Sequence, residues 1–420
     1  MGAGEDRISG LPDKLLLCIL ARLGSARAAV RTGVLSRRWR HILGPLPLLL
    51  LDGNHGAPPP PLESVLDKID AALAACDAPI FKRLDIGFGL WSTADGLGVP
   101  AMRAARWLRF ASERVVDGLY IYLPRPEIAD GEQEAVLELP ACEAKMGKDQ
   151  EELELPACTR AKTIKLKLQD PWRLRLTPAG VFTALTSLTI LMGAMTGGEL
   201  TALVSTRCPC LRRLRLCLTV VSDHDVSICS GSLHTLSLRL FGTQRLEVVA
   251  PILENLFLCD TIDEVCISAP KLVELAWRGA TCYPHHRHRF DDVGRCLRFL
   301  DVDIGASSAV ASLLQKFDQV HELKLAVSMP REITAYERFL NETNKMPKCK
   351  ILTVSMPWNQ HDSAPVMLHI LRSCSSVKRI SVQLNDYSGC SSVISNLFLT
   401  FLYLREHFKF RSTMDTLFEN

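Results

Sequence analysis

One short pattern of apolar positions recurs along most of this 420-residue chain. It reads apolar-x-x-apolar-x-apolar, and its last two positions alternate with polar residues, as in a β-strand that buries one face. From Ile190 to Leu325, the third positions of successive copies are separated by 26, 22, 20, 19, 25 and 23 residues. This spacing matches the leucine-rich repeat, whose period is about 20–29 residues. The eleven copies have their third positions at Ile86, Ile121, Ile190, Leu216, Leu238, Leu258, Trp277, Val302, Leu325, Val354 and Val382.

A single copy cannot bury its own apolar face, so neighbouring copies are expected to stack. The sequence therefore predicts an α/β leucine-rich-repeat solenoid over residues 62–348, with irregular repeats and a parallel sheet on its concave face. Prolines fall where the connections between strands belong, at Pro178, Pro209, Pro251 and Pro270. Residues beside the strand leucines are candidates, by position only, to contact a partner; examples are Arg212, Arg213, Arg215, His234 and Glu254.

Helical patterns precede the repeats. The spacing of Leu62, Val65, Leu66, Ile69 and Leu73 predicts one amphipathic helix, which ends near Cys76 and caps the first repeat. Residues 44–61 include four consecutive prolines and are expected to form a semi-rigid linker. Residues 6–43 show three short helical runs, and so short a unit buries little apolar surface by itself. We therefore expect this N-terminal unit to need a partner.

The N-terminal unit reads Asp6-Arg7-Ile8-Ser9-Gly10-Leu11-Pro12-Asp13, then Ile19-Leu20, then Ala29-Val30-Arg31-Thr32, then Val34-Leu35-Ser36-Arg37-Arg38-Trp39-Arg40. In order and spacing these residues resemble the F-box of plant F-box proteins, an all-α three-helix module. Gly24 and Gly33 depart from it, standing where Pro and Ser are common. The resemblance implies docking on the Skp-type adaptor of a Skp–cullin–F-box ubiquitin ligase. By resemblance, the adaptor contacts are Leu11, Pro12, Leu15, Ile19, Leu20, Val34, Leu35 and Trp39.

The other end of the chain also resembles part of this family. Residues 349–384 look like the FBD region that ends many plant F-box/repeat proteins, and they are expected to continue the solenoid. The tail over residues 385–420 departs from that pattern. The whole resemblance implies a substrate-recognition subunit whose repeats bind an unknown target protein. The alternative is a repeat scaffold that binds a protein or a small ligand outside any ligase.

Charge and hydropathy restrict the kinds of partner that the chain is expected to bind. Residues 1–41 hold eight Lys or Arg against three acids, while the whole chain has a net charge of +3. A basic segment can meet nucleic acid, a membrane surface or an acidic protein. These arginines alternate with apolar positions, which argues against a DNA-recognition helix. The longest apolar runs, Leu46–Leu51 and Leu397–Leu404, are much shorter than the ~20 residues of a membrane span. We expect neither a nucleic-acid nor a membrane partner.

The cysteines indicate a reducing compartment. All fifteen are scattered without a CxxC pair, and residues 1–10 lack the apolar core of a signal peptide. We therefore expect reduced thiols and a location in the cytoplasm or nucleus. Cys282 and three histidines up to His288 suggest zinc, but no second ligand pair lies at zinc-site spacing. An inter-repeat loop is the preferred interpretation of this cluster.

An acidic stretch, Glu127–Glu154, interrupts the repeats and carries a near duplication, Leu137–Cys142 and Leu153–Cys158. We expect it to lengthen a surface loop; a docking loop for a basic partner is the alternative. The chain contains no GxxxxGK[ST], no GxGxxG that opens a helix, no HExxH and no GxSxG. We therefore expect a non-catalytic protein with no metal and no cofactor.

Overall fold

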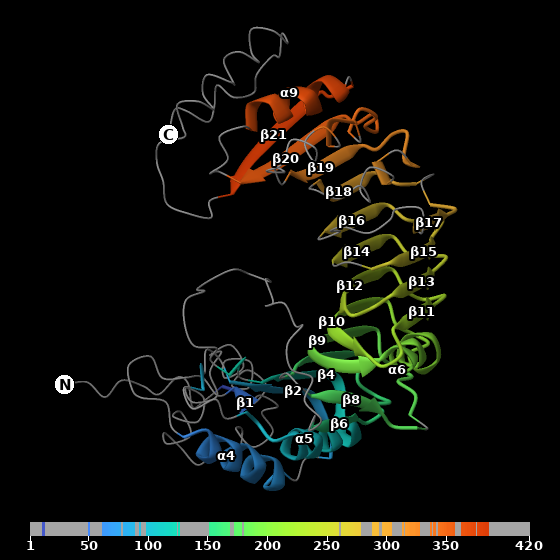
Figure 1. Cartoon of the computed structure of the whole chain (residues 1–420). Coiled ribbons are helices and arrows are strands. Elements are labelled where there is room, and N and C mark those ends of the chain that lie inside the picture. Colours follow the sequence, from blue (N-terminus) through green and yellow to red (C-terminus); the bar gives the residue numbers. More distant parts are fainter. Residues whose placement is uncertain are drawn as a thin grey trace, which may run out of the picture. The chain divides into compact units, whose positions relative to one another are not determined.

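Strands occur at the positions of the eleven predicted repeat copies, as seen in a computed structural model (Figure 1). Two units can be distinguished. The first comprises the chain up to Leu256 together with Glu264–Pro270, and the second comprises Phe257–Asp263 and the residues from Lys271 onward. The structure describes residues 11–12, 49–50, 61–76, 79–88, 92–93, 98–123, 125–126, 151–168, 172–178, 180–259, 262–278, 288–293, 296–304, 313–314, 316–327, 337, 339–341, 343–357, 363–374 and 376–385.

The first unit contains a parallel sheet in which neighbouring strands come from successive turns of the chain. Parallel neighbours require a crossover connection, and each coil of a solenoid supplies one. The predicted parallel-sheet solenoid is therefore confirmed. In order across the sheet, the strands are β1 (Leu49–Leu50), β2 (Phe81–Gly87), β4 (Val115–Tyr122), β7 (Thr163–Lys167), β9 (Ser187–Thr196), β10 (Arg213–Val221) and β12 (Thr235–Phe241). The next main strand, β14 (Asn255–Cys259), begins in the first unit and ends in the second.

The strand register stacks the predicted apolar positions on one another. Each of the stacked side chains in β9, β10 and β12 is at most 1% exposed. Burying one Leu or Ile contributes about 1.5–3 kcal/mol, so these columns are a major source of stability. The first column contains Leu188, Leu214 and Leu236, and the second contains Ile190, Leu216 and Leu238.

A second parallel sheet lies on the return side of the coils in the first unit, and the sequence analysis does not predict it. Its strands there are β11 (Asp225–Cys229), β13 (Arg245–Val249) and β15 (Glu264–Ser268). These coils are therefore strand–turn–strand units, whereas an α/β repeat places a helix on the return side. The buried residues that alternate along the three strands are Val226, Ile228, Leu246, Val248, Val265 and Ile267.

Two helices lie near the start of the first unit. The helix predicted over residues 62–76 is α4 (Leu62–Ala74), which buries four of its five predicted apolar residues. The second, α5 (Ala101–Arg114), is missing from the sequence-based prediction. Trp107 of α5, 1% exposed, donates a hydrogen bond of 2.7 Å to Asp70 of α4. The two helices therefore pack against each other through a buried indole. Two-residue strands β3 (Ser92–Thr93) and β5 (Arg125–Pro126) pair with each other.

The second copy of the duplicated acidic stretch is part of the solenoid. It overlaps β6 (Glu152–Leu155), which pairs with β8 (Arg173–Leu176). Leu153 and Leu155 are buried, which fixes this strand to the core. The loop prediction is therefore wrong for these residues, because the alternation of Glu and Leu is a strand pattern. The first copy lies outside the described residues.

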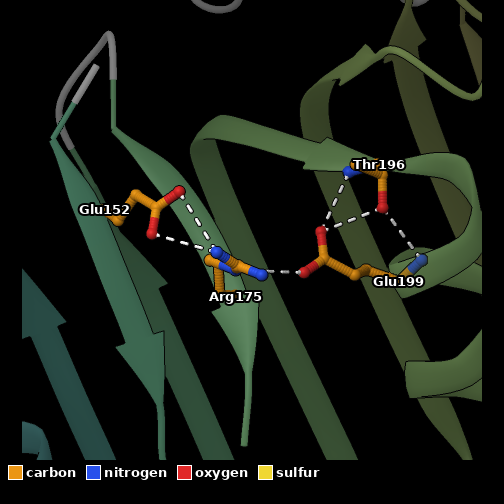
Figure 2. A network of polar contacts seen from close by, with 4 residues as sticks. All are labelled: Glu152, Arg175, Thr196 and Glu199. Carbon is orange, nitrogen blue, oxygen red and sulfur yellow. Dashed lines mark hydrogen bonds and ion pairs between the residues drawn. The ribbon is translucent and has the colours of Figure 1, made fainter. Parts of the chain in front are cut away.

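Figure 2 shows how polar contacts connect β6 and β8 to the short helix α6 (Gly197–Ala202). Arg175 of β8 lies 3.2 Å from a carboxylate oxygen of Glu152 and 3.9 Å from one of Glu199. The Thr196 hydroxyl accepts a hydrogen bond from the Glu199 backbone N–H, and the Glu199 carboxylate accepts one from the Thr196 backbone N–H. This capping box fixes the start of α6. A π-helical turn, η1 (Leu203–Arg207), follows.

The second unit contains parallel strands of its own. Leu300, Leu323 and Leu352 lie in register and are fully buried, as the repeat pattern predicts. No helix that the structure describes has the length and apolar character needed to cross a membrane. The elements of this unit are β16 (Glu274–Arg278), β17 (His288–Asp291), β18 (Phe299–Ile304), β19 (Glu322–Val327), β20 (Ile351–Pro357), α9 (Ser363–Ser373) and β21 (Arg379–Asn385).

Candidate binding surface on the parallel sheet

The outer face of the first unit's main sheet carries mainly basic charges. Side chains alternate between the two faces of a strand, so the residues between the buried columns all point away from the core. Among the outward strand positions that the register defines from β2 to β12, Asp85 is the one acidic residue. We call the basic residues of this surface the basic face; they are Arg83, Lys165, Lys167, Arg213, Arg215 and Arg239.

One end of the basic face is already paired within the protein. Arg83 donates a hydrogen bond of 2.7 Å to Asp85, and its guanidinium lies 4.2 Å from the centre of the Tyr120 ring. Lys165 lies 5.5 Å from the centre of the same ring. Gly118 leaves room for this ring, because a Cβ there would lie 2.6 Å from a ring carbon of Tyr120. Arg83 is thus engaged by an acid and an aromatic ring.

The centre of the basic face combines cations with hydroxyl groups. Lys165, Thr189 and Arg215 lie in one row across β7, β9 and β10. Strands are spaced about 4.8 Å apart, so the Cα atoms at the two ends of this row are about 10 Å apart. The adjacent row has one cation, on β10, and hydroxyls on the two other strands: Thr163, Ser187 and Arg213.

The two arginines of β10 are the most accessible cations of this central part. Arg213 and Arg215 are both exposed, and neither forms an ion pair within the part of the chain that the structure describes. They lie two residues apart on one strand and therefore project from the same face. Such planar guanidinium groups bind carboxylate and phosphate through paired hydrogen bonds. The geometry suits an anionic ligand.

The structure separates the five partner-contact candidates into two groups. Arg213 and Arg215 belong to the basic face, as described above. Arg212, His234 and Glu254 instead precede their strands, where the His234 backbone N–H donates to the Arg212 carbonyl at 2.9 Å and that of Glu254 to the His234 carbonyl at 3.0 Å. These three residues therefore form a row along the edge at which the strands begin.

The repeat pattern does not include β7, so Lys165 and Lys167 are not among the candidates that the sequence predicts. The pattern of β7 has Ala161, Ile164 and Leu166 at the three apolar positions. All three are buried, and Ile164 and Leu166 continue the two apolar columns. Accepting Ala at the first position would identify this strand from the sequence.

A second polar cluster lies on the sheet of the second unit. Arg278 donates a hydrogen bond of 2.6 Å to Asp301, and the ammonium nitrogen of Lys324 is 3.9 Å from the same carboxylate. Burial opposes the charge on Arg278, but the hydrogen bond to Asp301 and the Asp301 charge raise the pKa of Arg278 overall. Asp301 is 5% exposed, so the two cations stabilise a buried carboxylate.

The predicted adaptor contacts lie mostly outside the described residues. Leu11 is half-buried and Pro12 is exposed. The contacts assigned by resemblance therefore stay predictions, as does the three-helix fold of residues 6–43. The contacts outside the described residues are Leu15, Ile19, Leu20, Val34, Leu35 and Trp39.

Six of the eleven described thiols are buried, and three are exposed. Cys158 and Cys208 are buried, and burial raises the pKa of each thiol to about 12, which makes it a weak nucleophile at neutral pH. Within the described ranges, no group of three or more His, Cys, Asp or Glu residues is placed to hold a metal ion. Of the Cys and His cluster near residue 285, His288 lies 4.9 Å from Trp277, ring to ring, and its Nε2 is 3.2 Å from the Ile262 carbonyl.

Several plant F-box proteins are similar to this chain over part of its length. A putative F-box protein of Arabidopsis thaliana is 34% identical over 116 residues, which is 28% of this chain and 26% of the relative. An F-box/FBD/LRR-repeat protein of the same plant is 35% identical over 125 residues, again 28% of this chain and 26% of the relative. Over this part of its length, the chain is similar to plant F-box/FBD/LRR-repeat proteins. The meiotic F-box protein MOF of Oryza sativa subsp. japonica is 49% identical over 61 residues, 13% of each chain.

This relationship confirms the resemblance predicted from the sequence. The similarity covers only part of these proteins, because the chain spans about a quarter of the length of the first curated relatives that it matches. No protein-family model and no solved structure matches the chain.

Proposed function

We propose that this chain is the substrate-recognition subunit of a Skp–cullin–F-box ubiquitin ligase. In this proposal the N-terminal unit docks on a Skp-type adaptor, and through it on a cullin, while the repeats bind the protein to be ubiquitinated. The similarity to several plant F-box proteins carries the proposal. The repeat solenoid adds support, because its sheet offers a broad polar surface to a second protein.

The proposed role is non-catalytic. A target held on the repeats would stay within reach of the ubiquitin-carrying enzyme, so its effective concentration would rise without any new chemistry. Reduced thiols with a pKa of about 12 at Cys158 and Cys208 fit a protein that performs no thiol chemistry at these positions. We further propose that the protein acts in the cytoplasm or the nucleus, where cysteine thiols stay reduced.

The docking step is tested by co-expressing the full chain with a Skp-type adaptor and purifying the complex. We expect adaptor and chain to co-elute in one-to-one ratio. Replacing Leu11, Pro12 and Trp39 together by Ala should abolish co-elution, because apolar anchors and a large aromatic dominate such interfaces. The matched control is Leu62→Ala, a half-buried apolar residue of α4 outside the proposed docking unit. It should leave co-elution unchanged.

The result separates two functions. If the triple variant is captured as well as the unchanged chain, the docking assignment is wrong. If the unchanged chain captures no adaptor, the ligase proposal fails, and the repeats would then act as a scaffold outside any ligase. Circular dichroism of each variant excludes global unfolding as the cause of lost capture.

A further inference from the structure

We propose that the basic face of the first unit binds an acidic peptide segment of a protein partner. Binding itself does not depend on the ligase function; only the identification of the partner as a ubiquitination target rests on the proposed function. The repeat pattern alone does not indicate the chemistry of the partner. The observed strand register does, because it places cations together on one face and so favours a negatively charged partner. The inference follows from three features of this surface.

The first feature is a local excess of positive charge. The whole chain has a net charge of only +3, with 49 basic and 46 acidic residues. The basic face nevertheless brings six cations together against one acid, Asp85, and that acid is already bound by Arg83. A surface of one sign attracts ligands of the opposite sign and raises their association rate. This charge is therefore concentrated where an elongated ligand could lie.

The second feature is the arrangement of donors in the centre of the face. Arg213 and Arg215 project from one strand, and Lys165 lies two strands away in the row of Arg215. The ends of this row are about 10 Å apart, which is the length of about three residues of extended peptide. Acidic side chains separated by two or three residues could therefore engage both cations at once. Arginine would hold a carboxylate or phosphate in paired hydrogen bonds.

The third feature is a group of hydroxyls in the two rows that contain these cations. Thr163, Ser187 and Thr189 are half-exposed, and no side-chain hydrogen bond engages them among the residues that the structure describes. Hydroxyl groups can both donate and accept, so they complement the carboxylates and the backbone of a peptide. The surface is therefore equipped for the polar groups of a peptide as well as for its charge.

The same surface is less suited to single-stranded nucleic acid. Such ligands are bound by aromatic platforms on which bases stack, together with basic residues. In this part of the sheet the Tyr120 ring is approached by Arg83 at 4.2 Å and Lys165 at 5.5 Å. Other outward aromatic rings lie outside the central rows, at Tyr122 of β4 and Phe241 of β12, and the outward residues of β9 are Ser187, Thr189 and Leu191. An acidic peptide therefore fits the chemistry better.

The inference is tested with the full chain, co-expressed with the Skp-type adaptor if that improves its recovery. The probe is a fluorescein-labelled peptide of twelve residues in which Glu alternates with Ser, and a second version carries phosphoserine. A peptide with Gln in place of Glu is the uncharged reference. Fluorescence anisotropy measures Kd. We expect both acidic peptides to bind, the Gln peptide to bind at least about tenfold more weakly, and all binding to weaken with added salt.

Two charge-matched variants locate the binding site. Arg213→Glu combined with Arg215→Glu should weaken acidic-peptide binding by at least about tenfold. Arg106→Glu combined with Arg109→Glu makes the same change in net charge on exposed residues of α5, and should change Kd by less than about twofold. Arg213→Lys with Arg215→Lys keeps the charge but loses the paired geometry, so it should give an intermediate Kd.

Three results would overturn the inference: equal binding by the two charge-reversal variants, no binding of either acidic peptide, or tighter binding of a single-stranded oligonucleotide of the same charge. Each is distinguishable from failure of the proposed function. If peptide binding fails while the adaptor is still captured, only the inference is lost. If the adaptor is not captured but the acidic peptide binds, the ligase role is lost and the basic face stands. Circular dichroism confirms that the variants are folded.

Discussion

Arg278 donates a hydrogen bond of 2.6 Å to Asp301 on the neighbouring strand of the second unit. Asp301 is 5% exposed, and its other carboxylate oxygen, Oδ1, has no hydrogen-bond partner within the described residues. Lys324 approaches the oxygen that Arg278 already binds, at 3.9 Å. A buried carboxylate without a close cation is costly, so Asp301 depends mainly on Arg278.

The first prediction concerns this pair. Arg278→Ala should lower the free energy of unfolding by about 1–3 kcal/mol, because Asp301 would keep only the more distant Lys324. Urea unfolding of the full chain, followed by circular dichroism, measures the change. Amide hydrogen exchange in β16, β18 and β19 should show that the loss is local to the second unit.

Arg298→Ala is the matched control for this pair, since Arg298 is exposed and lies immediately before β18. We expect it to change stability by less than about 0.5 kcal/mol. In an Asp301→Ala background, Arg278→Ala should also cost little. An equal loss in both backgrounds would show that contacts other than the Asp301 pair account for the effect.

The second prediction compares two adjacent residues of β10. Leu216→Ala should destabilise the first unit by about 2–5 kcal/mol, because it opens a cavity in the column formed with Ile190 and Leu238. Arg215→Ala, on the exposed face, should cost less than about 0.5 kcal/mol. Urea unfolding of both variants checks the difference. Similar losses would mean that the apolar columns are not the main source of stability here.

The solenoid itself could be predicted from the sequence because its stability comes from a strict local pattern. Leu214 and Leu216 point to one side of a strand, and a near-constant step along the chain brings the equivalent residues of the next coil beside them. The pattern thus predicts both the buried face and the strand neighbours. Pro209, Pro251 and Pro270 fall in turns between strands, as expected.

The features that the sequence predicts incorrectly or not at all deviate from that pattern in identifiable ways. β4 contains two adjacent valines, and a bulge opposite β2 makes Val115 the buried one, 1% exposed, where the pattern predicts Val116. The strands of the second sheet are only five residues long, too short to distinguish from a turn by alternation alone. Small apolar residues such as Ala104 and Ala111 form much of the buried side of α5 and weaken its signal.

The basic face could be predicted only in part. Arg213 and Arg215 flank strand leucines that the repeat pattern locates, so their exposure follows from alternation. Lys165 is two strands away, and nothing in the local sequence indicates that it shares a row with Arg215. That neighbourhood depends on the pairing of β7, β9 and β10, which is a property of the folded chain.

The third prediction concerns two nearby thiols. Cys208 is 1% exposed and its pKa is raised to about 12 by burial, whereas Cys210 is exposed. The thiolate is the reactive form, and at pH 8 a thiol of that pKa is ionised to an extent on the order of 10⁻⁴. We expect iodoacetamide to label Cys210 within minutes and Cys208 only on unfolding. Peptide mass spectrometry at timed intervals measures both in one sample, and equal labelling rates would contradict the buried position of Cys208.

A histidine of the second unit should couple its stability to pH. His369 of α9 is half-buried, its Nε2 lies 2.8 Å from the Thr343 hydroxyl oxygen, and its ring centre is 6.2 Å from that of Phe339. Burial lowers the pKa of His369 below its ordinary value of 6.5, and the charge of Arg372 acts in the same direction. The folded state therefore binds the proton less readily than the unfolded chain does.

The fourth prediction follows from that sign. Well above pH 6.5 His369 is almost entirely deprotonated in both states, and the contribution of the neutral ring to stability is complete. As the pH falls through 6.5 toward the lowered pKa of the folded state, the unfolded chain takes up the proton first, so the free energy of unfolding should fall. His369→Gln removes this proton uptake, and the difference in stability between pH 7.5 and 5.0 should be smaller in the variant. Urea unfolding at both pH values measures it; an equal pH dependence in the two proteins would show that His369 titrates alike in the folded and unfolded states.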